Sequence, residues 1–201
     1  MNTNDTRPRL VLASASPARL RTLTAAGLTA EVVVSGVAES TVDVPRPDVY
    51  CLTLARLKAQ AVAARRSGQL VLGCDSVLAF DGAILGKPVD AADAVRRWRA
   101  MRGRSGVLHT GHCLVEAVSG KLAEEVAATT VYFADVTDAE IDAYVATGEP
   151  LVVAGAFMID GLGGAFVERV DGDPGTVIGL SLPLLRRLLA RLGVRLTDLW
   201  R

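Results

Sequence analysis

The chain has 201 residues, of which 50% are hydrophobic and 22% are charged. This composition is typical of a globular protein and excludes a disordered one. Lysine plus arginine and aspartate plus glutamate number 22 each, so no net charge favours a nucleic acid polymer or a membrane surface as a partner. The three widely spaced cysteines and the lack of a signal-peptide pattern predict a soluble, cytoplasmic protein with no membrane segment.

Hydrophobic periodicity and turn residues predict strands and helices along the whole chain. In chain order these are a strand over 9–13, a helix over 17–27, a strand over 31–36, a helix over 50–66, a strand over 69–75 that leads into a hairpin at 81–82, a helix over 90–101, strands over 106–118 and 121–133, a helix over 137–146, a strand over 165–170 and a helix over 181–193. Because they interleave without a strict strand–helix–strand rhythm, we expect an α/β protein with a mixed sheet and hairpins. A single domain over 1–201, with a cleft between two lobes, is the expected organisation.

The turn between the first strand and the first helix has the composition of a phosphate-binding site. It reads L-A-S-A-S-P-A-R-L over 12–20. A strand that enters a helix through small residues exposes the first backbone N–H groups and the positive end of the helix dipole. Ser14 and Ser16 add hydroxyl donors, and Arg19 adds a positive charge. A simpler interpretation is that Ser16 only caps the helix and Arg19 is solvated.

The apolar run over 69–75 leads to a carboxylate. We expect Asp75 at the carboxyl end of a strand, where ligands of α/β proteins usually bind. There it can hold a divalent cation or take a proton from a water molecule that attacks a phosphoryl group. The competing interpretation is an Asp that bonds its own backbone in a loop. Its neighbour Cys74 is predicted to be a buried apolar residue and not a nucleophile.

Three further charged residues are candidates for the same site. Lys87 stands between Gly86 and Pro88, a rigid setting from which its ammonium can contact a phosphate. Glu39 lies in a polar loop after the second predicted strand and is a candidate second metal-binding carboxylate. Lys58 lies in an apolar helix and, by itself, is expected to be a surface lysine whose stem packs along the helix.

The two histidines are weaker candidates. His109 and His112 are three residues apart in a predicted strand, which puts them on opposite faces. Zinc needs further ligands, and neither the histidines nor the cysteine spacing supplies them. We therefore expect no zinc site.

Several motifs, taken together, resemble those of the Maf family. The first is L-A-S-A-S-P-x-R, followed by G-x-D-S before a hairpin that ends in I-L-G-K-P, and then by S-G-x-x-H over 105–109. The carboxyl-terminal half adds Y-V-A-T-G-E-P, A-G-A-F, G-G-A-F-V-E-R-V-D-G-D and V-I-G-L-S-L. The motifs follow the family's order and span nearly the whole chain, so the resemblance is far more specific than any one of them.

The resemblance implies a house-cleaning nucleoside triphosphate pyrophosphatase. Such an enzyme hydrolyses a nucleoside triphosphate between the α and β phosphates to the monophosphate and pyrophosphate. The implied fold is an ITPase-like mixed α/β structure with two lobes around a central cleft. The implied cofactor is a divalent cation, Mg²⁺ or Mn²⁺. The family is often dimeric and has an older association with septum formation.

The resemblance also implies residue roles. Asp75 matches the catalytic Asp that activates water and, with Glu39, is an implied metal ligand. Lys58 and Lys87 match lysines that contact the triphosphate, and the motif around Arg19 matches the phosphate-binding turn. The substrate-binding candidates are Ser14, Ser16, Arg19, Lys58, Ser76, Lys87 and Asp160.

The chain departs from the family pattern at several positions. Ala18 stands where the first Arg of S-P-R-R is usual, and Val152 and Val153 replace an Asp and a Lys of E-P-x-D-K-A-G. Ser76 and Asp160 stand where Thr and Gln are common. In the family, the positions of Ala18, Ser76 and Asp160 vary with substrate, and this trio matches neither the dTTP/UTP branch nor the 7-methyl-GTP branch.

An acid at position 160 accepts hydrogen bonds where an amide both donates and accepts. Asp160 therefore hints at a base edge rich in N–H donors, such as guanine or a modified purine. A rotated Asp160 paired with Arg169 or with a metal is the alternative.

Two other functions fit the same motifs. A nucleotidyltransferase also begins with a strand, a small-residue loop and an Arg, and also uses a metal-binding Asp, but it needs an acceptor substrate. A non-enzymatic nucleotide-binding protein linked to septum formation is the second alternative, because the chain lacks an Arg and a Lys that are usual in the family.

Overall fold

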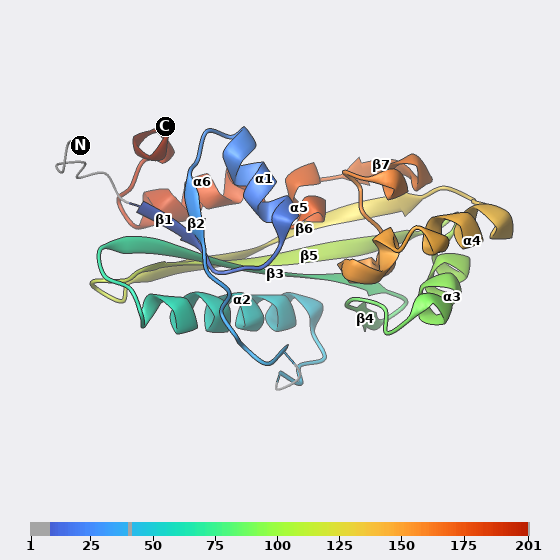
Figure 1. The fold of residues 1–201 in the computed structure, drawn as a ribbon, viewed down its shortest axis with the longest axis horizontal. Coiled ribbons are helices and arrows are strands. Elements are labelled where there is room, and N and C mark those ends of the chain that lie inside the picture. Colours follow the sequence, from blue (N-terminus) through green and yellow to red (C-terminus); the bar gives the residue numbers. More distant parts are fainter. Residues whose placement is uncertain (1–8, 40–41, 201) are drawn as a thin grey trace.

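The computed structural model describes residues 9–39 and 42–200 (Figure 1). The amino-terminal residues 1–8, where we expect no signal peptide, lie outside the described part. The strands are β1 (Arg9–Leu12), β2 (Ala30–Val32), β3 (Gln69–Phe80), β4 (Ala83–Leu85), β5 (Ser105–Glu116), β6 (Leu122–Phe133) and β7 (Val167–Asp171). The α-helices are α1 (Pro17–Ala25), α2 (Pro47–Ala63), α3 (Ala91–Met101), α4 (Asp138–Ala146), α5 (Pro174–Ile178) and α6 (Leu182–Arg191). Short 3₁₀ helices are η2 (Glu149–Val152), η3 (Ala154–Ala156), η4 (Leu162–Phe166) and η5 (Leu196–Leu199).

The strands form one mixed sheet in the order β2-β1-β3-β5-β6-β7, and β4 pairs with the end of β3. β1 runs parallel to β2 and β3, whereas the other pairs are antiparallel. The long strands β3, β5 and β6 have 12 residues each and form the centre of the molecule (Figure 1). The prediction of an α/β protein with a mixed sheet and hairpins is confirmed.

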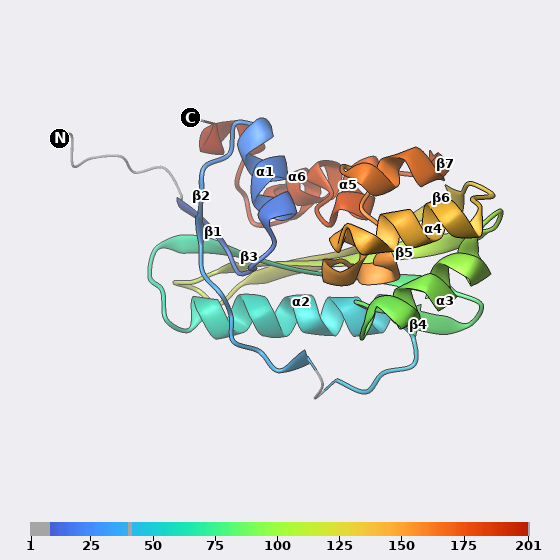
Figure 2. The same ribbon diagram turned by 45° about the vertical axis from the view of Figure 1, so that its right-hand side comes forward.

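Helices cover both faces of this sheet. α2 lies along one face, and α1, α5 and α6 lie on the other (Figure 2). Alternate residues of β1 therefore enter different cores, Leu10 and Leu12 towards α6 and Val11 towards α2. Burial on both faces explains why the first strand reads as a continuous apolar run. A third core, around Trp98, lies where α3 and α4 meet the far ends of the long strands.

One predicted boundary is wrong in a way that matters for the site. The strand predicted to end at Asp75 continues to Phe80, so this carboxylate lies in the middle of a strand and not at its carboxyl end. A buried carboxylate interrupts the apolar pattern without interrupting the backbone ladder, because Asp75 still pairs with Gly111 of β5. The change from apolar to polar side chains at Asp75 predicted the end of the strand, but the strand continues beyond it.

Other boundaries move by a few residues. The helix expected over 50–66 is α2, which begins with Pro47 at its first position, a favoured place for proline. The strand expected over 31–36 ends at Val32. The predicted helix starts at Asp90, Thr137 and Ser181 are confirmed as N-caps, each with a side-chain oxygen that accepts a backbone N–H.

The hairpin between β3 and β4 is confirmed, with positive φ at Asp81 and Gly82 as the tight two-residue turn requires. Cys51, Cys74 and Cys113 are free and buried, and burial raises the pKa of the Cys74 thiol to about 11. The prediction that Cys74 is a buried apolar residue is confirmed. Among the residues described, no helix has the length and apolar character needed to cross a membrane.

Candidate active site

A cleft of about 660 Å³ opens beside the middle of β3. Its walls come from the turn between β1 and α1, the segment after β2, the side of α2, the loop after β4, and the chain from η2 to Asp160. The cleft brings together every residue that the sequence singled out as a site candidate: Ser14, Ser16, Arg19, Glu39, Lys58, Asp75, Ser76, Lys87 and Asp160.

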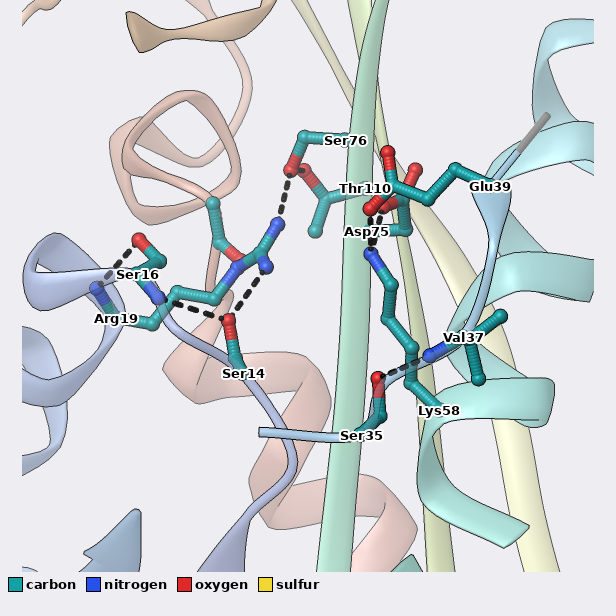
Figure 3. A network of polar contacts seen from close by, with 11 residues as sticks. Ser14, Ser16, Arg19, Ser35, Val37, Glu39, Lys58, Asp75, Ser76 and Thr110 are labelled. Carbon is teal, nitrogen blue, oxygen red and sulfur yellow. Dashed lines mark hydrogen bonds and ion pairs between the residues drawn. The ribbon is translucent and has the colours of Figure 1, made fainter. Parts of the chain in front are cut away.

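At one end of the cleft a lysine bridges two carboxylates (Figure 3). Nζ of Lys58 donates to Oε1 of Glu39 and to Oδ1 of Asp75, and both distances are 2.6 Å. Lys58 and Asp75 are only 8% and 7% exposed, whereas the Glu39 side chain is 56% exposed. The expectation that Lys58 is a surface lysine is therefore wrong. Its stem lies on the sheet side of α2, and its charge is held inside the protein.

The two carboxylates differ in their environment and hence in their acidity. Burial raises the pKa of Asp75 above its ordinary value, although Lys58 and Arg19 oppose this shift. Burial also disfavours ionisation of Glu39, but the hydrogen bond and charge of Lys58 outweigh it and hold the pKa of Glu39 below its ordinary value. Thus Asp75 is the better proton acceptor of the two, and Glu39 stays a fixed negative charge.

Arg19 lies at the other end of the cleft and is also buried, at 9% exposure. Its Nε donates to the carbonyl oxygen of Gly179 at 2.8 Å, Nη1 to Ser14 Oγ at 3.0 Å and Nη2 to Ser76 Oγ at 3.0 Å. The interpretation of Arg19 as a solvated side chain is wrong. A guanidinium has five N–H donors, so these three bonds hold Arg19 in place and leave two donors for a ligand.

The hydroxyl of Ser14 is oriented by what it accepts. Ser14 Oγ takes hydrogen bonds from the backbone N–H of Ser16, at 3.2 Å, and from Arg19. With both lone pairs engaged, the hydroxyl has only its proton left to offer. Ser14 is therefore a hydrogen-bond donor towards the cleft, as a phosphate oxygen requires. Ser16 caps α1 by accepting from the Arg19 N–H, as the simpler interpretation holds, and its side chain also lines the cleft.

Ser76 differs from Ser14, because its hydroxyl can only accept a hydrogen bond from a ligand. Thr110 Oγ1 donates to the carbonyl oxygen of Thr176 at 2.8 Å, so it must accept the proton of Ser76 Oγ, which lies 2.9 Å away. Ser76 in turn accepts from Arg19. Its proton is thus committed, and a ligand finds in Ser76 only a hydrogen-bond acceptor. Figure 3 shows this chain of hydroxyls running from Arg19 into the sheet.

Asp160 pairs with a residue that the sequence did not suggest. Its Oδ2 accepts from Nη2 of Arg21 at 2.9 Å, which joins α1 to the segment after η3. Arg169, the partner considered from sequence, stacks on the ring of Tyr132 with its guanidinium carbon 4.0 Å from the centroid. Arg21 and Thr110 are the functional candidates that sequence reasoning missed, because nothing in their local sequence distinguishes them from ordinary helix and strand residues.

Lys87 is exposed at the rim of the cleft and makes no hydrogen bond or ion pair with any described residue. Its charge is therefore available to a ligand. Three of the residues that depart from the Maf pattern, Ala18, Val152 and Val153, also line the cleft, so the missing Arg and Lys leave apolar surface at its wall.

The carboxylates suit a divalent cation in type. Oxygens of Glu39 and Asp75 both lie 2.6 Å from the Lys58 ammonium nitrogen, so a cation would use the carboxylate lone pairs that Lys58 leaves unused. Mg²⁺ is commonly held by one or two carboxylates together with water and substrate phosphates. Within residues 9–39 and 42–200, no three His, Cys, Asp or Glu side chains form a metal-binding group. The donor set therefore fits a cation that takes its remaining ligands from water and substrate.

His112 is buried on the α6 side of the sheet. Its Nε2 accepts from the backbone N–H of Ser181 at 2.9 Å, and its Nδ1 lies 3.0 Å from the carbonyl oxygen of Thr110. Burial lowers the pKa of His112 to about 4, so the ring is neutral, with its proton on Nδ1. Strand alternation turns His109 to the other face.

Comparisons with known proteins show which family this chain is similar to. The family model described as Maf-like protein matches residues 9–192. A protein named nucleoside triphosphate pyrophosphatase from Salinispora tropica is 68% identical over 96% of this chain and 87% of its own length. Proteins of the same name from Streptomyces coelicolor and Nostoc punctiforme are 58% and 48% identical, each over 96% of this chain and over 95% and 98% of their own lengths. The chain belongs to the Maf family.

Proposed function

We propose that this protein is a nucleoside triphosphate pyrophosphatase formed by one Maf domain. It hydrolyses a nucleoside triphosphate between the α and β phosphates and releases the monophosphate and pyrophosphate. The names of its relatives support this activity. The observation that carries the proposal is the buried Lys58 ammonium held between Asp75 and Glu39 at the wall of a cleft that also contains Arg19.

Asp75 is proposed to accept the proton of the attacking water. Its Oδ1 is held by Lys58, while Oδ2 makes no hydrogen bond with the described residues and is free to orient a water molecule. The raised pKa of Asp75 makes it a stronger base than a solvated Asp. Lys58 keeps the carboxylate in one orientation.

The opposite end of the cleft is proposed to bind the phosphates. Ser14 offers its hydroxyl proton, and Arg19 offers the two N–H groups that its fixed position leaves unused. Lys87 adds a positive charge at the rim. Negative charge that develops on the leaving pyrophosphate is stabilised by such preplaced donors without further reorganisation.

We propose that Glu39 and Asp75 hold Mg²⁺ or Mn²⁺ when substrate is bound. Such a cation would neutralise part of the charge on the phosphates. A homodimer and a cytoplasmic location stay predictions of the family resemblance.

The base is proposed to lie near Asp160, Arg21 and Ser76. The Asp160 carboxylate accepts hydrogen bonds, the Arg21 guanidinium donates them, and Ser76 accepts but does not donate. A base edge that presents N–H donors beside a carbonyl, as guanine does, complements this set better than an edge with acceptors alone.

The test is incubation of the purified protein with Mg²⁺ or Mn²⁺ and a panel of dTTP, UTP, GTP and 7-methyl-GTP, with the products resolved as monophosphate or diphosphate. We expect monophosphate and pyrophosphate from at least one nucleotide. Asp75→Asn should lower kcat by about 10²–10⁴-fold with little change in nucleotide binding.

The matched control is Asp138→Asn, which alters a surface carboxylate paired with Arg99 and Arg102 and should leave turnover unchanged. Diphosphate as the product, or release of pyrophosphate only when an acceptor alcohol is added, contradicts the proposal; the second outcome indicates a nucleotidyltransferase. Nucleotide binding without turnover indicates a binding protein.

A further inference from the structure

The position of Lys87 depends on the loop that carries it. Lys87 makes no hydrogen bond or ion pair with the described residues. Its four-carbon stem is flexible, and a contact made by such a side chain costs conformational entropy. The position of its Cα is then what limits where the ammonium can reach. The structure shows that the backbone on both sides of Lys87 is held by a single ion pair on the neighbouring helix α3.

The residue before Lys87 is fixed through its carbonyl. The oxygen of Gly86 accepts from Nη1 of Arg97 at 2.7 Å and from the backbone N–H of Gly155 at 3.1 Å. The residue after Lys87, Pro88, is buried, and the N–H of Val89 donates to Oδ2 of Asp93 at 3.1 Å. Hydrogen bonds thus hold the backbone of the loop one residue before and two residues after Lys87.

The two side chains that hold the loop, Asp93 and Arg97, form an ion pair. Asp93 and Arg97 lie one turn apart on α3 with 2.7 Å between Oδ2 and Nη2, and their side chains are 10% and 15% exposed. The carboxyl is held ionised: burial works against its charge, but the hydrogen bonds from Arg97 and Val89 lower the pKa of Asp93 below its ordinary value. A partly buried charge pair with shared hydrogen bonds is rigid, because breaking one contact leaves a desolvated charge behind.

Arg96 provides a natural comparison. It also pairs with Asp93, through Oδ1 at 2.8 Å, but its side chain is 69% exposed and it makes no contact with the loop among the hydrogen bonds of the described residues. Two adjacent arginines therefore share one carboxylate, and only Arg97 also reaches the backbone that carries Lys87.

We propose that Arg97, together with Asp93, is a positioning residue for catalysis: it fixes the Gly86–Val89 loop so that the Lys87 ammonium can reach the phosphates in the cleft. This inference rests on the proposed function of Lys87 as a phosphate contact. It assigns to α3, which contributes no side chain to the cleft lining, a role in the activity.

The test is a double-mutant cycle on kcat/KM for the nucleotide turned over best, using Lys87→Met, Arg97→Met and the double variant. We expect the loss of Arg97 to displace the loop by up to about one ångström. Such a displacement should lower kcat/KM of Arg97→Met by about 5- to 50-fold. If Arg97 acts through Lys87, adding Arg97→Met to Lys87→Met should cost less than about twofold more. Independent effects that multiply in the double variant would refute the positioning role.

Arg96→Met is the matched control, because it removes a neighbouring charge from the same carboxylate; we expect less than a twofold change. An equal loss in Arg96→Met and Arg97→Met would overturn the proposal in favour of a general charge effect. Thermal unfolding of each variant checks the fold. Should Arg97→Met not fold, Arg97→Lys, which keeps the charge but lacks the planar fork, is carried through the same cycle with the same criterion.

The positioning role of Arg97 can be tested separately from the proposed enzymatic activity. If the wild-type protein turns over no nucleotide, the same cycle is measured on the Kd of a non-hydrolysable triphosphate analogue. Non-additive losses there support the positioning of Lys87 even without turnover, and multiplying losses overturn it.

Discussion

At the scale of single residues, the candidate site depends on one lysine shared by two carboxylates of different burial. Asp75 is enclosed and Glu39 reaches solvent, so the same ammonium leaves the pKa of one raised and that of the other lowered. Two titratable groups with environments that separate their pKa values are typical of acid–base chemistry. This contrast supports Asp75 as the base and Glu39 as the permanent charge.

The pH dependence of turnover follows from that difference. Because the pKa of Asp75 is raised, the basic form is lost at a higher pH than the ordinary Asp value of about 3.9. We expect kcat/KM to fall on the acid side with a midpoint above that value. Lys58→Met removes the main opposing charge and should move this acid limb to higher pH, measured from pH 4 to 9. Lys121→Met, at an exposed position, should leave it in place; an unmoved limb in Lys58→Met contradicts the assignment of Asp75.

At the scale of elements, two glycines allow α2 to lie directly on the sheet. A Cβ at Gly73 would stand 2.2 Å from the carbonyl oxygen of Ala55, and one at Gly111 would stand 2.4 Å from that of Cys51. The register of β3 and β5 pairs Gly111 with Asp75. The helix therefore approaches the strands closely beside the catalytic candidate, and this approach lets Lys58 reach it.

Gly111→Ala tests that arrangement. The added methyl group must push α2 outward, since it meets backbone and not a flexible side-chain end. Overpacking of this kind costs about 1–3 kcal/mol, so urea unfolding should show a loss in that range. Turnover should fall further than the fraction of unfolded protein explains, because the Lys58–Asp75 contact is lengthened. Full activity in a folded Gly111→Ala protein contradicts the close-approach argument.

At the scale of the whole molecule, buried polar residues join the helices of one face to the central strands. Thr110 and His112 of β5 bind the carbonyl oxygen of Thr176 in α5 and the N–H of Ser181 at the start of α6. His112 has no exposed surface. Protonation of its Nε2 would set a second donor against the Ser181 N–H, so the folded state requires the neutral ring.

The stability of the fold should therefore depend on pH through His112. Its folded pKa of about 4 lies below the ordinary value of about 6.5, so the unfolded chain binds the proton first as pH falls. The neutral His112 ring contributes roughly 3 kcal/mol to the free energy of unfolding. This contribution is fully present above pH 6.5 and is lost as the pH falls towards 4. Urea unfolding at pH 7 and pH 4.5 should show this loss in the wild type and a smaller one in His112→Gln; equal losses contradict it.

The sequence by itself determined the family, the mixed α/β class and the residues that gather at the cleft. Local physics was sufficient for the caps at Ser16, Asp90 and Thr137 and for the Asp81-Gly82 turn, because these depend on neighbours within four residues. The site candidates came from motif order along the chain. Their shared location in one cleft was implied by resemblance and not by any local pattern.

Only the tertiary structure decided how those residues act on one another. Lys58 looked like a surface residue and Asp75 like the end of a strand, since sequence periodicity reports the polarity of a side chain and not the charge that faces it across 17 residues. The Arg21–Asp160 pair and the Asp93–Arg97 grip on the Lys87 loop likewise join separate segments. A buried charge is stable only beside its partner, and the partner is chosen by how the helices pack on the sheet.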